Sequence, residues 1–153
     1  MPKKKTRWTS DAVVPEASLA AALVAVVDDD ASVRRSTCRL IGSSGVACEA
    51  FGSAEQFLES GRVRETACLI LDVRMPGMDG LELQRELAAR GLNLPVIFLT
   101  ARASEEEEWR ARRAGAHDFL RKPVSRGVLL GAIRTALERS IGGGREDDDD
   151  DRA

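Results

Sequence analysis

The sequence has almost no excess of charge of either sign, and it contains a single histidine. Its 23 lysines and arginines stand against 25 aspartates and glutamates, so the formal net charge is -2. A protein that holds nucleic acid by its phosphates needs a positive field, so no direct binding of nucleic acid is expected. His117 has no second histidine or cysteine nearby and makes a poor metal site. We expect it to be exposed and without a role.

Cysteine is also scarce, and its number is odd. The spacings of Cys38, Cys48 and Cys68 match neither a zinc ligand pair nor a disulfide framework. We therefore expect all three to be reduced and structural, in a cytoplasmic protein.

No hydrophobic run is long enough to span a bilayer. The run Leu19–Val27 covers about nine residues, whereas a membrane helix needs about 20. Lysines 3–5 precede it as in a signal peptide, but acidic residues and a proline intervene, and the run ends in three aspartates without a cleavage region. A buried strand is the better interpretation, and no membrane partner is expected.

The length of 153 residues suits one domain with tails and leaves no room for a second, output domain. Apolar residues make up 43% and charged residues 31%, the balance of a water-soluble globular protein. We expect a disordered or extended N-terminal extension over 1–21 and a domain over 22–141. Three glycines and five aspartates dominate 142–153, which predicts a disordered acidic tail.

Short apolar runs alternate with amphipathic segments five times, the pattern of an α/β protein whose parallel sheet is covered on both faces. The predicted strands are 23–28, 46–51, 67–72, 95–100 and 118–122. The second is weaker and fits a sheet edge, and the third is continuously apolar and fits the centre. Ser53 with Gln56, and Ser104 with Glu107, predict capping boxes at two helix starts.

Polar residues stand where the predicted strands end. Asp28 and Asp29 end the first strand, Asp72 the third, Thr100 the fourth and Lys122 the fifth. Ligands of open parallel sheets bind outside the carboxyl ends of the strands, so these groups are expected to converge. Clustered carboxylates need a cation, and an all-oxygen site favours a hard divalent ion. Mg²⁺ is the predicted ion, and Mn²⁺ would also fit.

The motifs VAVVDDD, LILDVRMPGMDG, VIFLTA and GAHDFLRKP, in this order and spacing, resemble the receiver domain of two-component response regulators. The resemblance covers about residues 22–140. It implies a doubly wound, flavodoxin-like fold of three α/β/α layers, with strand order 2-1-3-4-5. It also implies a cis bond between Lys122 and Pro123.

The resemblance further implies a role for each site residue. Asp72 is then the phosphoryl acceptor, and Asp28 and Asp29 hold the metal ion together with Asp72 and the backbone carbonyl of Arg74.

Two more roles concern phosphate contact and switching. Thr100 and Lys122 would bond phosphate oxygens, and Phe119 would turn inward when Thr100 moves. The responding face would be the fourth helix, the fifth strand and the last helix.

These inferences predict a response regulator phosphorylated by a histidine kinase or phosphotransfer protein, acting through an unknown downstream protein. The chain would not be an enzyme apart from self-catalysed phosphoryl transfer to Asp72 and its hydrolysis. A phosphorylation-dependent homodimer is compatible with this role.

One alternative is the receiver portion of a transcription factor whose DNA-binding domain is absent. Another is a phosphohydrolase with an aspartyl-phosphate intermediate, disfavoured because Arg74 stands where a second acid is needed and no insertion builds a substrate cap.

Several neighbouring residues receive a structural interpretation. Asp30 is expected to cap the following helix rather than contact metal. Arg74 and Arg102 flank the site and would influence access of water. Trp109, among charged neighbours, is expected to be packed or partly exposed, on a surface that is able to contact a partner.

Overall fold

A five-stranded parallel sheet of order β2-β1-β3-β4-β5 forms the centre of the molecule. The computed structural model describes the backbone of residues 22–152 and the side chains of residues 22–140, so the predicted N-terminal extension lies outside the described residues. The strands are β1 Leu23–Val27, β2 Ala47–Phe51, β3 Thr66–Leu71, β4 Val96–Thr100 and β5 Asp118–Arg121. Each agrees with its predicted range to within one residue, and the predicted strand order is confirmed.

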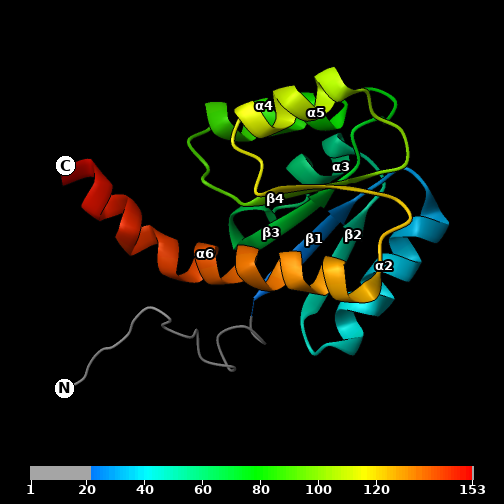
Figure 1. Cartoon of the computed structure of the whole chain (residues 1–153), viewed down its shortest axis with the longest axis horizontal. Helices are drawn as coiled ribbons and strands as arrows, with labels where there is room; N and C mark the ends of the chain where they lie inside the picture. Colours follow the sequence, from blue (N-terminus) through cyan, green and yellow to red (C-terminus); the bar gives the residue numbers. More distant parts are fainter. Residues whose placement is uncertain (1–21, 153) are drawn as a thin grey trace.

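Helices cover both faces of this sheet and complete the three predicted layers (Figure 1). Helices α2 (Ala31–Ser43) and α6 (Arg126–Arg152) lie on one face, and α3 (Ala54–Glu59), α4 (Gly80–Ala89) and α5 (Glu105–Arg113) lie on the other. A 3₁₀ turn, η2 (Val63–Glu65), precedes β3 and was not predicted. Neighbouring residues of β1 enter opposite cores: Ala25 packs beside α3 and α4, and Val26 beside α2 and α6. Burial on both faces explains why the central strands are continuously apolar.

The helix starts follow the predicted caps with one difference. Asp30 caps α2 by accepting from the backbone of Ser32 at 2.9 Å, and Ser104 and Glu107 form the full capping box of α5. Ser53 caps α3 as expected, but the Gln56 side chain accepts from the backbone of Gly52 instead of completing the box.

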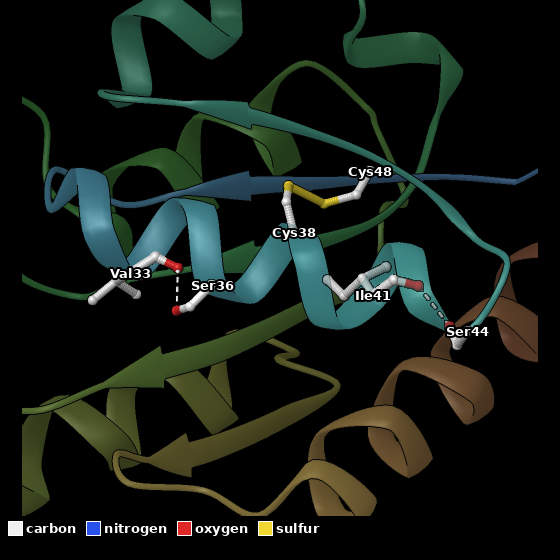
Figure 2. The surroundings of a disulfide bond; sticks show 6 residues. All are labelled: Val33, Ser36, Cys38, Ile41, Ser44 and Cys48. Atoms are coloured by element: carbon white, nitrogen blue, oxygen red, sulfur yellow. Dashed lines mark hydrogen bonds between the residues drawn. A yellow bond between two sulfur atoms is a disulfide. The ribbon is translucent and has the colours of Figure 1, made fainter.

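The prediction of three reduced cysteines is wrong for two of them. Cys38 of α2 and Cys48 of β2 form a disulfide, with their Cα atoms 5.5 Å apart (Figure 2). Because α2 packs on the edge strand that follows it, the two side chains face each other, at a separation suited to a disulfide. Cys68 is free and buried in β3, and burial raises the pKa of its thiol to about 12.

The last helix is the longest element of the chain that the structure describes, and the disorder expected for residues 142–153 stays a prediction. The backbone of α6 is helical without a break from Arg126 to Arg152, and Figure 1 shows the helix continuing past the end of the sheet. Among the described residues, no helix combines the length and the apolar character needed to cross a membrane.

Contrary to the expectation from the sequence, His117 is not an idle surface residue. It is half-buried at the start of β5, its Nε2 shares a hydrogen bond with the Thr135 hydroxyl at 2.8 Å, and its Nδ1 lies 3.5 Å from Arg139. Burial and the charge of Arg139 lower the pKa of this imidazole. His117 therefore ties the start of β5 to α6.

Candidate functional site

Three carboxylates meet at the carboxyl edge of the sheet. Oxygen atoms of Asp28, Asp29 and Asp72 all lie within 4.8 Å of one another. The arrangement follows from the pairing of β1 with β3, because the last pair in that ladder is Val27 with Leu71. Asp28 and Asp72 come directly after this pair, and Asp29 follows one residue later. The Asp72 backbone N–H also donates to the Val27 carbonyl at 3.1 Å, which holds the two strand ends together.

Among the described residues, one ammonium group stands beside these carboxylates, that of Lys122. The Lys122 Nζ lies 3.0 Å from Asp28 Oδ2 and 3.8 Å from Asp72 Oδ2. Its backbone N–H donates to the Thr100 carbonyl at 2.8 Å, so β4 and β5 together position it. The Lys122–Pro123 bond is cis, as the resemblance implied. The predicted residues from four strand ends are therefore brought into one site.

The surroundings of Asp72 disfavour the ionised form of its carboxyl group. Burial, and then the charge of Asp28, raise the pKa of the Asp72 carboxyl, while the Thr100 hydroxyl, Lys122 and the backbone N–H of Arg74 act in the opposite direction. One ammonium thus faces three carboxylates. A hard divalent cation with an oxygen ligand set would balance this charge, so the residues present fit Mg²⁺.

Thr100 and Phe119 lie next to this cluster. Thr100 is 1% exposed, and its hydroxyl donates to the Arg102 carbonyl at 3.0 Å. The Phe119 ring is turned into the core, 5% exposed, with its centroid 5.6 Å from that of Phe98. The guanidinium of Arg121 covers the ring from outside at 5.3 Å.

The side chain of Arg74 points to α5 rather than standing free beside the acceptor. Its guanidinium makes an ion pair of 3.0 Å with Glu107, the residue that also completes the capping box of α5. The backbone N–H of Arg74 donates to Asp72 Oδ1 at 3.4 Å. Arg74 therefore joins the loop after β3 to the first turn of α5. The predicted metal contact of its carbonyl stays a prediction.

Two structural contributors to the site were missed by sequence reasoning. Gly80 begins α4 so close to the loop after β3 that a Cβ atom there would overlap the Asp72 carbonyl oxygen. Arg34 of α2 donates to the Asp28 carbonyl at 2.7 Å. The glycine in the MDG segment was a visible signal for the first, but nothing in the sequence marks the second.

The fold and this site together define a class: a doubly wound parallel α/β domain with an acidic, lysine-bearing site at the carboxyl edge of its sheet. Residues 24–134 match the model of the response regulator receiver domain family. The chain belongs to this family, whose model matches most of its length.

Relatives and solved structures agree with this assignment. Nodulation protein W of Bradyrhizobium diazoefficiens is 44% identical over 132 residues, covering 86% of this chain and 58% of that protein. The transcriptional regulatory protein FixJ of Azorhizobium caulinodans is 42% identical over 125 residues, covering 82% and 59%. This chain thus spans somewhat more than half the length of these relatives.

Among solved structures, the response regulator StyR aligns with a TM-score of 0.76 at 40% identity, covering 86% of this chain and 67% of that one. A receiver protein from Burkholderia phymatum aligns with a TM-score of 0.68 at 40% identity, covering 76% and 95%. Both likenesses support the receiver fold of the whole described domain.

Proposed function

We propose that this chain is a phosphoacceptor response regulator in which Asp72 receives a phosphoryl group from a histidine kinase or phosphotransfer protein. The observation that carries the proposal is the meeting of the Asp28, Asp29 and Asp72 oxygens within 4.8 Å, with the Lys122 ammonium 3.8 Å from Asp72. A carboxylate in such a place is a nucleophile whose attack needs charge neutralisation rather than proton transfer.

The chemistry is a single transfer. A carboxylate oxygen of Asp72 forms the new bond to phosphorus, the bond from phosphorus to the donor histidine nitrogen breaks, and that nitrogen keeps the electron pair. Lys122 offsets charge on one phosphoryl oxygen, and the Thr100 hydroxyl bonds another. Asp28, Asp29, Asp72 and the carbonyl of Arg74 would hold Mg²⁺, which when bound supplies further positive charge against the phosphoryl oxygens. Hydrolysis of the aspartyl phosphate returns the carboxylate.

The signal is a change of the face formed by α5, β5 and α6. The phosphorylated carboxylate carries about two negative charges and three acceptor oxygens, which draw the Thr100 hydroxyl from the Arg102 carbonyl toward Asp72. The Phe119 ring already lies in the core beside Phe98, so it would repack there into the space that Thr100 leaves, and this pair is the proposed switch. The outcome is a population shift between two packings, read by a downstream protein or a second copy of the chain.

Two alternative functions differ in their support. The relatives named transcriptional regulatory protein and nodulation protein extend beyond the matched region, so an output domain in a longer product is a second candidate. A product of the native gene that extends past residue 153 into a helix-turn-helix region would establish it.

The phosphohydrolase candidate has no comparable support, because the Arg74 guanidinium is paired with Glu107 and supplies no general acid beside Asp72. We also propose a cytoplasmic location, on the ground that the phosphohistidine of a kinase is accessible there. The expectation of three reduced cysteines no longer supports this location, because Cys38 and Cys48 form a disulfide.

The test is phosphorylation with acetyl phosphate and Mg²⁺, comparing the wild type with Asp72→Asn by intact mass. A phosphoryl mass increase on the wild type alone is expected. Asp79→Asn, which removes a carboxylate from the nearby cap of α4 but not from the cluster, is the matched control and should still be modified. Equal modification of wild type and Asp72→Asn would remove Asp72 from its proposed role.

A further inference from the structure

A groove of about 250 Å³ lies between α4 and α5, away from the carboxylate cluster. Its floor is fixed by a buried contact: the Gln84 side chain of α4 donates to the Ala111 carbonyl of α5 at 3.0 Å, beside the buried Leu81. The two helices are thus held at a set distance, and the groove is a formed surface rather than a gap between loose elements.

The groove is positively charged, although the chain as a whole is not. Its charged lining residues are all arginines, Arg85, Arg110 and Arg113. None of the three has a carboxylate partner within the described part of the chain, whereas Arg112 on the same helix pairs with Glu108 at 3.0 Å. Three guanidinium groups are therefore free to bind carboxylates from elsewhere.

An exposed aromatic side chain stands in this basic groove. Trp109 is 59% exposed, and the Arg113 guanidinium lies 5.1 Å from its ring centroid. Tryptophan and arginine are among the residue types enriched at the positions that contribute most to binding energy in protein interfaces. Their combination favours a ligand with both an apolar group and negative charge.

The groove is also connected to the acceptor loop. Glu107, which pairs with Arg74, precedes Trp109 by two residues on α5. A movement of the loop after Asp72 would thus be passed to the helix that carries Trp109, Arg110 and Arg113.

We propose that this groove binds an acidic peptide segment of the downstream partner, with carboxylates on Arg85, Arg110 and Arg113 and an apolar side chain on Trp109. The coupling to phosphorylation rests on the proposed function. The binding itself does not, since the groove is formed in the unphosphorylated structure.

The probe is the synthetic peptide Asp-Glu-Leu-Asp-Glu, with Asn-Gln-Leu-Asn-Gln as the uncharged control, titrated by calorimetry into the full chain. Replacing Trp8 by phenylalanine leaves Trp109 as the only tryptophan, so its fluorescence gives a second readout. We expect binding of the acidic peptide alone, weakened by added salt. Arg110→Gln with Arg113→Gln should lower the affinity on the order of tenfold, because two of the three guanidinium groups that bind carboxylates are then lost.

The matched control is Arg134→Gln, which removes an exposed arginine of α6 that pairs with Glu138 outside the groove. It should leave the affinity unchanged, with circular dichroism confirming that all variants fold. Equal binding of both peptides, an equal loss in Arg134→Gln, or no binding at all would overturn the proposal. If the variant Asp72→Asn binds the peptide as the wild type does, the proposal for the groove stands even if the phosphorylation test fails. Loss of binding there would count against it.

Discussion

Gly80 illustrates how one residue without a side chain permits the site to form. At this position α4 meets the loop that follows β3, and the Gly80 N–H donates to the Val73 carbonyl at 2.8 Å. A Cβ atom would overlap the Asp72 carbonyl oxygen and lie 3.1 Å from the Val73 Cα. These are backbone atoms, which cannot rotate away as a flexible side chain would. A larger residue must therefore displace either the start of α4 or the acceptor loop.

We predict that Gly80→Ala lowers the free energy of unfolding by about 1 to 3 kcal/mol, the usual cost of overpacking. Urea denaturation measures this. Gly131→Ala in α6 is the matched control, because no heavy atom lies within 4 Å of its Cβ position. It should leave stability unchanged or raise it by up to about 1 kcal/mol, since alanine is the better helix former. Equal effects of the two changes would contradict the close approach at Gly80.

At the scale of elements, the edge of the sheet depends on α2. Within the described part of the chain, strand β2 pairs only with β1 and has no fully buried residue, so little apolar burial holds it in place. The Cys38–Cys48 disulfide ties this strand to the helix that precedes it. The same unit frames the acidic pair, because Arg34 of α2 holds the Asp28 carbonyl and the Asp28 N–H donates to the Phe51 carbonyl of β2.

We predict that reduction of this disulfide lowers the free energy of unfolding by about 2 to 3 kcal/mol, the cost expected for opening a loop of this length. Thermal denaturation with and without dithiothreitol measures the change. In the variant Cys38→Ser with Cys48→Ser, dithiothreitol should have no effect, because Cys68 is the remaining thiol and is buried. A similar response of wild type and variant to dithiothreitol would show that the disulfide does not stabilise the fold.

At the scale of the whole molecule, the buried charge of the site lowers the free energy of unfolding. The two hydrophobic cores offset this loss. The pKa of Asp72 is raised above its usual value of 3.8 by burial and by Asp28. From that value up to the raised pKa, the folded chain holds more protons than the unfolded chain. The free energy of unfolding therefore falls as pH increases through this window, and the loss persists above it.

We predict that, without Mg²⁺, Asp72→Asn is more stable relative to the wild type at pH 7 than at pH 3. The amide cannot ionise, so it avoids the cost of a buried charge beside Asp28. Denaturant unfolding at a series of pH values measures the difference, and saturating Mg²⁺ at pH 7 should reduce it, since a bound cation stabilises the wild-type carboxylate. A difference that stays constant from pH 3 to pH 7 would contradict the raised pKa.

The regular elements and most of the site were predictable from the sequence for a local reason. Apolar runs and helical spacing report burial residue by residue, and strand ends in a parallel sheet share one edge. That is why the positions of Asp28, Asp72, Thr100 and Lys122 could be inferred before their distances were known. The match of four separate motifs to one family added the expected strand order.

Contacts between side chains of different elements were beyond such reasoning. The Cys38–Cys48 bond, the Arg74–Glu107 pair and the hydrogen bond of His117 to Thr135 depend on how each helix is seated on the sheet. The separation of two residues in the sequence does not tell how far apart they lie in space. The packing angle of a helix depends on all the side chains that interlock with it. Local patterns therefore specify which segments become strands and helices. The packing of those segments against one another specifies which residues finally touch.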